Sequence, residues 1–244
     1  MRACIVIPNY NHVAVIEAVL TELSALSLPI IMVNDGSSGE ASEVMRYCAA
    51  KFESLTLIEH QHNQGKGGAV QTGLLTADKL GFTHAIQVDA DGQHDLNDIK
   101  TLIKLGKTHP NSLISGRPVY DESVPKVRLY SRYITHFWVW IETLSFSVKD
   151  SMCGFRCYPV AITAKLLREK RLGKRMDFDI EIMVRLYWRG VKSIFMPTKV
   201  IYPEGGSSHF RALEDNVLIS WMHTRLFFGM LPRIPKLLWR KFSG

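Results

Sequence analysis

Short apolar runs that alternate with helix-like segments are the feature of this chain that most constrains its fold. The runs have strand length and lie at residues 4–8, 29–33, 55–59, 84–88 and 113–115. Each of the first four is followed by a polar turn and then by a segment with helical spacing of its apolar residues. This alternation predicts an α/β fold, with a mostly parallel, Rossmann-like sheet and helices on both faces.

Polar clusters follow the expected strands at their carboxyl ends. They comprise Pro8–Asn11, Asn34–Ser38, Asn63–Gly68 and Asp89–His94. In parallel sheets a ligand binds at the carboxyl ends of the strands. We therefore expect the four clusters to converge on one rim of the sheet.

Asp89 and Asp91 directly follow the fourth run and form a candidate metal site. Two carboxylates at this spacing can face one hard cation, and Mg²⁺ or Mn²⁺ prefers oxygen ligands that it shares with substrate phosphates. Gln93 offers a third oxygen. A solvated surface turn is the alternative, but the apolar strand before the pair favours the metal.

Asp35 and the turn at Gly65–Gly68 are candidates for holding a nucleotide. Asp35 is placed to accept hydrogen bonds from a base or ribose, or equally to cap the helix that starts near residue 39. The N–H groups of the glycine-rich turn, with Lys66, would suit a diphosphate. A plain strand–helix turn stays open, since the sequence lacks the P-loop pattern.

Several basic residues are candidates for binding phosphate. Arg117 follows the fifth run, and Arg128 and Arg132 lie four residues apart, so all three can present a guanidinium or stay solvated. His209, after two glycines, fits a mobile clamp over phosphate or an ordinary surface loop.

Three acidic residues are candidates for acid–base chemistry. Asp150 precedes Arg156 in a short motif, and Asp179 and Glu181 would share one face of an extended segment. Asp179 and Glu181 can equally serve as partners for nearby arginines.

Charge is distributed unevenly along the chain. The net charge of +7 divides into −5 over residues 1–125, +8 over 126–175 and +4 over 176–244. An acidic first half suits a metal ion, and a basic second half suits a phosphorylated substrate, a membrane surface or nucleic acid. No nucleic-acid-binding motif is visible, so we expect no nucleic-acid partner. The four cysteines form no disulfide framework, which indicates free thiols in the cytoplasm.

The C-terminal part predicts a basic amphipathic helical segment. Val217–Leu231 is apolar, contains no acid, and as a helix would be about 22 Å long. This is short of the ~30 Å of a bilayer core, so the segment suits a helix lying in the membrane interface or one packed on the domain. We expect a main domain at 1–210 and this segment at 211–244.

The motifs together resemble those of the family 2 inverting glycosyltransferases of the GT-A fold, particularly the dolichyl- and polyprenyl-phosphate sugar transferases. They occur in the order of that family at Ile7–Asn11, Val33–Ser38, Asn63–Ala69, Val88–His94, Ser115–Arg117, Asp150–Arg156 and Phe178–Glu181. His12 departs from the pattern, since the lipid-phosphate mannosyltransferases usually carry Glu there.

The resemblance implies a GDP- or UDP-sugar donor and a lipid-linked or envelope-glycan acceptor. It also implies which residues contact the donor: Pro8, Tyr10, Asn11, Asp35, Gly36, Lys66, Asp89, Ala90 and Arg117. It places Mg²⁺ or Mn²⁺ at Asp89, Asp91 and Gln93, and acceptor or phosphate contacts at Arg128, Arg132, Arg156 and His209.

The resulting hypothesis is a metal-dependent inverting glycosyltransferase, cytoplasmic and peripheral on the inner face of the membrane. A non-catalytic sugar-nucleotide or membrane-binding module is one alternative. A sugar-1-phosphate nucleotidyltransferase is another, although Pro8–His12 lacks the glycine-rich activating loop of that class.

Overall fold

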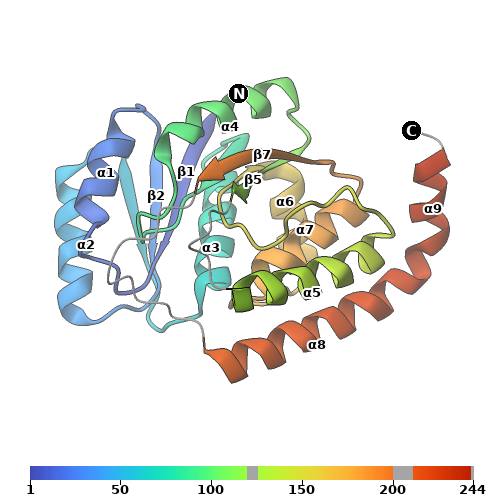
Figure 1. Cartoon of the computed structure of the whole chain (residues 1–244). Coiled ribbons are helices and arrows are strands. Elements are labelled where there is room, and N and C mark those ends of the chain that lie inside the picture. Colours follow the sequence, from blue (N-terminus) through green and yellow to red (C-terminus); the bar gives the residue numbers. More distant parts are fainter. Residues whose placement is uncertain (120–125, 200–210, 243–244) are drawn as a thin grey trace.

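A seven-stranded mixed sheet forms the centre of the protein (Figure 1). The computed structural model describes residues 1–119, 126–199 and 211–242, apart from the side chains of 126–131, 212 and 241–242. The strands are β1 (Ala3–Asn9), β2 (Ile30–Asn34), β3 (Leu55–Glu59), β4 (His84–Gln87), β5 (Leu113–Val119), β6 (Arg156–Pro159) and β7 (Ser193–Lys199). Their order is β3-β2-β1-β4-β6-β5-β7, and only β6 runs antiparallel to its neighbours β4 and β5.

Helices cover both faces of this sheet, as the sequence predicts. One face packs against α1 (Ile16–Ser24), α2 (Gly39–Lys51) and α4 (Ile99–Thr108), the last preceded by the short η1 (Leu96–Asp98). The other packs against α3 (Lys66–Lys79), α6 (Val160–Glu169) and α7 (Phe178–Trp188). In β1, Ile5 and Ile7 belong to the first core while Cys4 and Val6 belong to the second. Both faces of β1 are buried, which explains its continuous apolar run.

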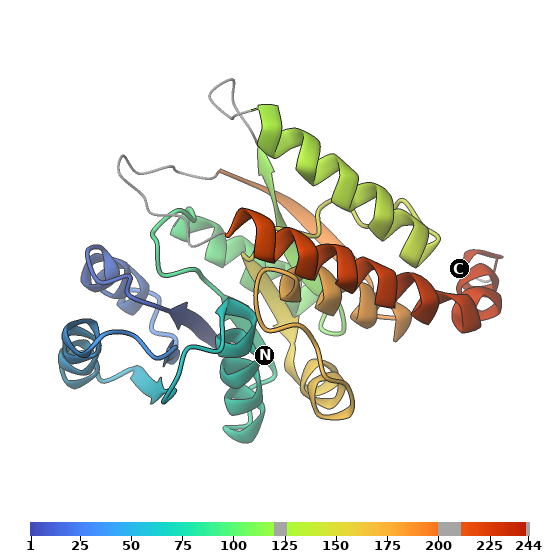
Figure 2. The ribbon, with the colours of Figure 1, turned by 90° about the horizontal axis from the view of Figure 1, so that it is seen from below.

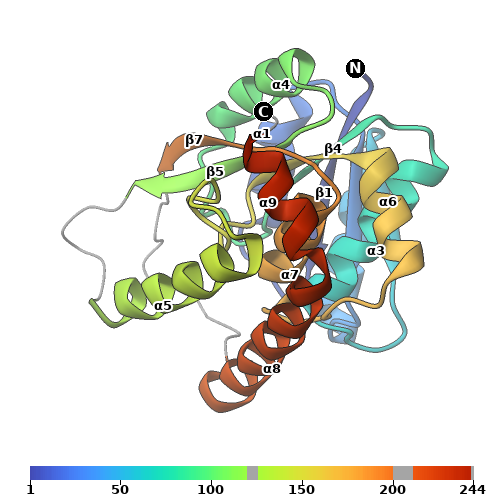
Figure 3. The same cartoon turned by 90° about the vertical axis from the view of Figure 1, so that its right-hand side faces the viewer.

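The remaining helices form a separate layer beside α7. They are α5 (Lys126–Thr143), α8 (Ala212–Met230) and α9 (Ile234–Phe242), with η2 (Leu231–Arg233) between the last two. Figure 2 shows α8 running alongside α5, and Figure 3 shows α9 following from the end of α8. The inner face of α8 buries Met222, Leu226 and Met230 in the same core as α3. Within the described ranges, no helix has the length and apolar character needed to cross a membrane.

Two details of the sequence prediction were wrong. Asp179 and Glu181 lie in the helix α7 and not in an extended segment. Gly116 and Arg117 lie inside β5 and not after it, because β5 continues to Val119 in parallel pairing with β7. Apolar periodicity could not locate this end, since the outer half of β5 alternates exposed and buried residues.

Gly73 lets helix α3 approach strand β1 closely. A Cβ atom there would lie 2.3 Å from Cγ1 of Val6, well inside van der Waals contact. Glycine is unfavourable inside a helix, so this position indicates a packing constraint.

We predict that Gly73→Ala lowers the free energy of unfolding by about 1–3 kcal/mol, because the added methyl overpacks the core. Gly39→Ala, where a Cβ meets nothing within 4 Å, is the control and should not destabilise. Urea denaturation of both variants measures the effect, and equal stability of the two would contradict the constraint.

Candidate functional site

Four loops meet at the carboxyl ends of β1 to β4 and are tied to one another by hydrogen bonds. The first tie joins the β1 and β2 loops. The backbone N–H of Asn11 donates to Ser37 Oγ at 3.0 Å, and Asn11 Oδ1 accepts from the Ser38 N–H at 2.9 Å. Asn11 has a positive φ of 59°, a conformation that asparagine tolerates. Tyr10, beside it, is half-buried.

Pro8 lies at the point where β1 and β4 separate. It pairs in register with Val33 of β2, whereas the pairing of β1 with β4 ends at Val6 and Gln87. Proline has no amide hydrogen to donate to a neighbouring strand. The chain after β4 therefore turns away, and this turn carries Asp89 and Asp91.

Asp35 is the second tie and holds the glycine-rich turn. Its carboxylate accepts from the N–H of Gln64 at 2.9 Å and of Gly65 at 2.8 Å, and it lies 2.7 Å from Nδ1 of His60. Only 2% of Asp35 is exposed. The cap of α2 is Ser38, which accepts from the Ala41 N–H, so Asp35 does not cap that helix.

This arrangement engages part of the backbone of the glycine-rich turn, for which the sequence predicted diphosphate binding. The N–H groups of Gln64 and Gly65 bind Asp35, and that of Gly68 donates to the Lys174 carbonyl at 2.9 Å. Gly36 packs against the same turn, since a Cβ there would lie 2.5 Å from the Asn63 nitrogen. What the turn presents to the rim is the Lys66 side chain.

Lys66 is the third tie. Its Nζ donates to Asp89 Oδ2 at 2.8 Å and lies 3.5 Å from Asp179 Oδ2. Burial opposes the charge of Lys66, but the two carboxylates outweigh burial and raise the pKa of the ammonium. Burial likewise opposes ionisation of Asp89, yet Lys66 and His94 lower its pKa to about 2. These shifts favour Lys66 and Asp89 as a charge pair near neutral pH.

The acidic turn after β4 retains one unused acceptor. Asp89 Oδ1 is buried and has no hydrogen-bond partner among the described residues. Asp91 is partly exposed, and its Oδ1 accepts from the Gln93 N–H at 3.1 Å. Ala90 between the two acids is buried. No group of three His, Cys, Asp or Glu side chains able to hold a metal occurs in the described part of the chain.

These residues fit a cation held partly by substrate. Mg²⁺ and Mn²⁺ prefer oxygen ligands, and Mg²⁺ commonly binds through one or two carboxylates plus phosphate oxygens. The unused Asp89 Oδ1, with Asp91 two residues on, provides such a partial set.

Two residues of this site were missed by sequence reasoning. A Cβ at Gly154 would lie 2.8 Å from both Lys66 Nζ and Gln87 Nε2, and 3.1 Å from Asp89 Oδ2. His94 Nδ1 accepts the Asp89 N–H at 3.3 Å. Both belong to the motifs quoted above, but only the fold shows that they touch Asp89.

The basic candidates separate into three cases. Arg117 is exposed on β5. Arg132 instead binds Asp150 through two nitrogens, Nε at 2.8 Å and Nη2 at 2.9 Å. The Arg128 backbone lies in α5 but its side chain is outside the described set, and His209 lies outside the described residues altogether.

Two acidic candidates are engaged in the scaffold and not at the rim. Asp150 is 2% exposed and accepts from the N–H groups of Met152 and Cys153 as well as from Arg132. Glu181 is fully buried, with Arg185 at 2.7 Å. Of the three acid–base candidates, only Asp179 lies beside Lys66 and Asp89.

Arg156 also differs from its expected role in binding phosphate. Its guanidinium is fully buried and donates to the carbonyl oxygens of Asp179 at 2.6 Å and Ser151 at 2.8 Å. It therefore joins α7 to the loop before β6, because a buried guanidinium needs nearby acceptors.

A mixed sheet with flanking helices and an acidic turn at its carboxyl rim is the GT-A arrangement of glycosyltransferases. Solved structures agree with this class. TarS of S. aureus, crystallised with UDP-GlcNAc, gives a TM-score of 0.63 at 14% identity, covering 100% of this chain and 73% of that chain. The mannosyltransferase PcManGT from Pyrobaculum calidifontis, in complex with GDP-Man and Mn²⁺, gives 0.57 at 15% identity, covering 100% and 75%.

Sequence comparison identifies the family. The model of glycosyl transferase family 2 matches residues 4–170. A UDP-N-acetylglucosamine–dolichyl-phosphate N-acetylglucosaminyltransferase of Methanococcus voltae is 26% identical over 243 residues, 93% of this chain and 94% of that protein. Dolichyl-phosphate beta-glucosyltransferase ALG5D of Trichomonas vaginalis is 31% identical over 165 residues, 64% of this chain and about half, 49%, of that protein. The chain belongs to glycosyl transferase family 2 and is a glycosyltransferase related to the dolichyl-phosphate sugar transferases.

We predict that Asp35→Asn lowers the free energy of unfolding by about 1–3 kcal/mol, because the carboxamide nitrogen faces an N–H donor that is then unsatisfied. Asp95→Asn is the matched control, since Asp95 accepts the Asn97 N–H through one oxygen that asparagine retains. Chemical denaturation compares the two variants. An Asp35→Asn variant as stable as the control would show that the hydrogen bonds from Gln64 and Gly65 to Asp35 do not stabilise the fold.

Proposed function

We propose that this protein transfers a sugar, with inversion, from a nucleoside diphosphate sugar to a lipid-phosphate acceptor, and that the transfer needs Mg²⁺ or Mn²⁺. The observation that carries the proposal is the unused, buried Oδ1 of Asp89 beside Asp91, at the carboxyl end of β4. The partial set of oxygen ligands there is what a cation shared with a diphosphate requires.

The donor would lie across the linked loops. The nucleoside would contact Pro8, Tyr10, Asn11 and Gly36, with Asp35 shaping this surface through the turn that it binds. Asp89, Asp91 and Gln93 would hold the cation, which when bound supplies electrostatic stabilisation of the leaving diphosphate. Arg117, exposed on β5, would add a guanidinium to the same diphosphate.

Lys66 positions Asp89 in this proposal. Its ammonium holds Oδ2 and leaves Oδ1 free, so the carboxylate is oriented before the donor binds. In many enzymes, charge that is oriented before the reaction makes the largest single contribution to stabilising the transition state. Asp179, 3.5 Å away, fixes Lys66 from the other side.

The acceptor would be a phosphate, which needs no general base because it is already anionic. Asp150 and Glu181 are bound to arginines inside the scaffold. Asp179 is already paired with the ammonium of Lys66, 3.5 Å away. Relatives named for dolichyl-phosphate support an acceptor of this kind.

The outward faces of α5, α8 and α9 would bind the membrane that holds such an acceptor. Exposed apolar side chains recur on these faces, with 60% of Trp221 and 67% of Trp239 exposed; the set is Tyr133, Phe137, Val217, Trp221, Phe228 and Trp239. No acidic residue follows Asp215, whereas five basic residues do. Aromatic and basic side chains together favour an anionic membrane interface.

We predict that one of GDP or UDP binds in a Mn²⁺-dependent manner and that Asp91→Ala weakens this binding at least about tenfold, or 1.4 kcal/mol. Isothermal titration calorimetry with and without Mn²⁺ measures both. The control is Asp98→Ala, a partly exposed acid near the start of α4. Metal-independent binding in every variant would contradict the proposed metal site.

We further predict that vesicles with anionic lipid bind the protein and that neutral vesicles bind it much less. Trp221→Ser with Trp239→Ser should reduce sedimentation with anionic vesicles severalfold, because two interfacial anchors are removed. Tyr47→Ser, which changes an exposed aromatic side chain of α2, serves as the control. Unchanged sedimentation of the double variant would reject this surface.

A further inference from the structure

Four polar side chains beside the carboxyl end of β4 are linked so that donors and acceptors alternate. The Nζ atom of Lys66 lies 2.8 Å from Asp89 Oδ2 and 3.5 Å from Asp179 Oδ2. Gln87 serves the same two acids. Its Nε2 donates to Asp179 Oδ1 at 3.5 Å. Against the effect of burial, a hydrogen bond from Gln87 also adds to the charge of Lys66 in lowering the pKa of Asp89. Two carboxylates are thus joined through two nitrogens, one charged and one neutral.

Gln87 can support both acids in only one of its two amide orientations. The residue is fully buried. A rotation of the amide by 180° would turn Oε1, which only accepts hydrogen bonds, toward the two carboxylates. Acceptors would then face acceptors, and no hydrogen would lie between them. The arrangement therefore needs a group that fixes the amide.

Tyr158 of β6 is placed to fix the amide. In the antiparallel pairing of β4 with β6, Tyr158 lies opposite Ala85, two residues before Gln87, so both side chains are on one face of the sheet. The Tyr158 hydroxyl donates to Gln87 Oε1 at 3.0 Å, and Tyr158 is fully buried. With Oε1 held by this hydroxyl, Nε2 points to the carboxylates.

The direction of the Tyr158 hydroxyl is set in turn by Arg156. A guanidinium can only donate hydrogen bonds, so the hydrogen bond between Arg156 and Tyr158 uses the hydroxyl oxygen as its acceptor. The single hydroxyl hydrogen is then left for Gln87. Burial raises the pKa of Tyr158, although the charge of Arg156 opposes this, and the hydroxyl therefore keeps its hydrogen near neutral pH.

A neutral donor suits the position of Gln87 better than a second ammonium would. Lys66 already occupies Oδ2 of Asp89. Another positive charge beside this carboxylate would repel a divalent cation approaching Oδ1. An amide holds the carboxylate by hydrogen bonding without adding charge, and Oδ1 is left without a partner among the described residues.

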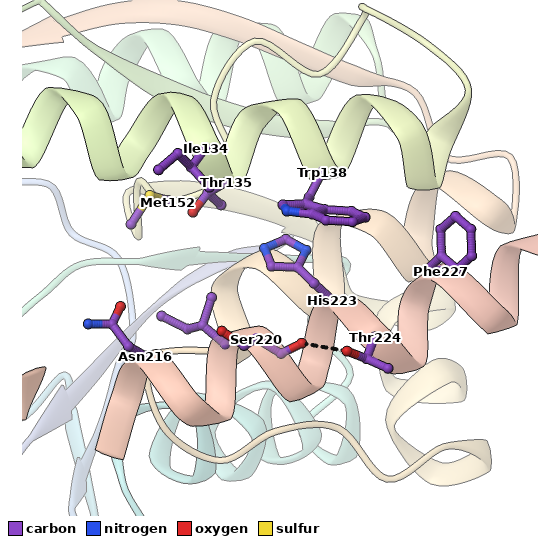
Figure 4. A pocket seen from close by; sticks show the side chains of 10 residues that line it. Ile134, Thr135, Trp138, Met152, Asn216, Ser220, His223, Thr224 and Phe227 are labelled. Atoms are coloured by element: carbon purple, nitrogen blue, oxygen red, sulfur yellow. Dashed lines mark hydrogen bonds between the residues drawn. The ribbon is translucent and has the colours of Figure 1, made fainter. Parts of the chain in front are cut away.

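The loop before β6 covers both nitrogen donors. A Cβ on Gly154 would lie 2.8 Å from Lys66 Nζ and 2.8 Å from Gln87 Nε2, so the backbone of this loop packs directly on them. Two residues earlier, Met152 lines a groove of about 440 Å³ between α5 and α8 (Figure 4). Asp150 accepts the Met152 N–H at 2.9 Å. The loop is thus anchored on the side away from the donors.

We propose that Gln87 is a positioning residue of the donor site and that Tyr158 acts through it. The amide holds Asp89 and Asp179 in the arrangement that leaves Oδ1 of Asp89 for a cation shared with the donor. Tyr158 contributes by permitting only the amide orientation that donates. The inference rests on the proposed function for the cation, whereas the orientation of the amide is testable without metal.

The first test uses the full chain without metal or nucleotide. Nuclear magnetic resonance should show the side-chain N–H signals of Gln87, assigned by their loss in Gln87→Met, in slow exchange with water. Tyr158→Phe removes only the hydroxyl and should speed this exchange about fivefold, the effect of one lost hydrogen bond. Tyr187→Phe, at a partly buried position near the other end of α7 from Asp179, is the control and should change nothing. Unchanged exchange in Tyr158→Phe would overturn the inference.

The second test follows binding of GDP or UDP as Mn²⁺ is titrated. The Mn²⁺ concentration for half-maximal binding should rise about fivefold in Tyr158→Phe and at least as much in Gln87→Met. The double variant should match Gln87→Met alone, because Tyr158 acts only through Gln87. A merely structural role would lower the fraction of protein that binds and leave the Mn²⁺ midpoint unchanged. That result, or effects that multiply in the double variant, would overturn the inference.

Failure of the proposed function gives a different result. If neither GDP nor UDP binds to the wild type with Mn²⁺, the donor site is wrong, whereas slow exchange of the Gln87 amide that depends on Tyr158 still supports the role of Tyr158. If a nucleotide binds with Mn²⁺ and the midpoint in Tyr158→Phe equals that of the wild type, only the inference fails.

Discussion

The carboxylate of Asp35 is the interaction on which the arrangement of the site depends. It is buried and accepts the N–H groups of Gln64 and Gly65, so it fixes the turn from which α3 begins. An anion at the start of a helix also interacts favourably with the helix dipole. Lys66, the first residue of α3, is thereby aimed at Asp89. One buried acid thus sets the geometry of another loop that it does not touch.

A second theme is that several of the charged residues that the sequence offered as site candidates serve structure. Asp150, Glu181 and Arg156 are buried and hydrogen-bonded, as the cost of burying an unpaired charge requires. They hold α5, α7 and the loop before β6 around the short acidic turn. The residues left for chemistry are those with an unused atom, chiefly Asp89.

The sequence predicted the fold well and the site in part, for physical reasons. Apolar strand runs and the polar turns after them are local signals, so β1 to β4 and the convergence of their loops were predicted correctly. Whether a charged side chain is buried depends on distant elements, and this explains why the burial of Arg156 was not predicted. That Asp150 binds Arg132 while Asp179 lies beside Lys66 could not be predicted either, because both contacts depend on how α3, α5 and α7 pack. The contact of Gly154 with Asp89 arises from the antiparallel return of β6, which no local pattern indicates.

That return strand also has a consequence for biosynthesis. Gln87 pairs with Arg156, so the β4 side of the sheet has no partner until the ribosome has delivered the chain through residue 159. An uncovered strand edge is a template for association with other chains, and pairing between distant segments forms slowly. The nascent protein therefore passes through a stage in which this edge of β4 is unpaired. That stage ends as β6 pairs with β4, and the same pairing brings Gly154 against Lys66 and Asp89.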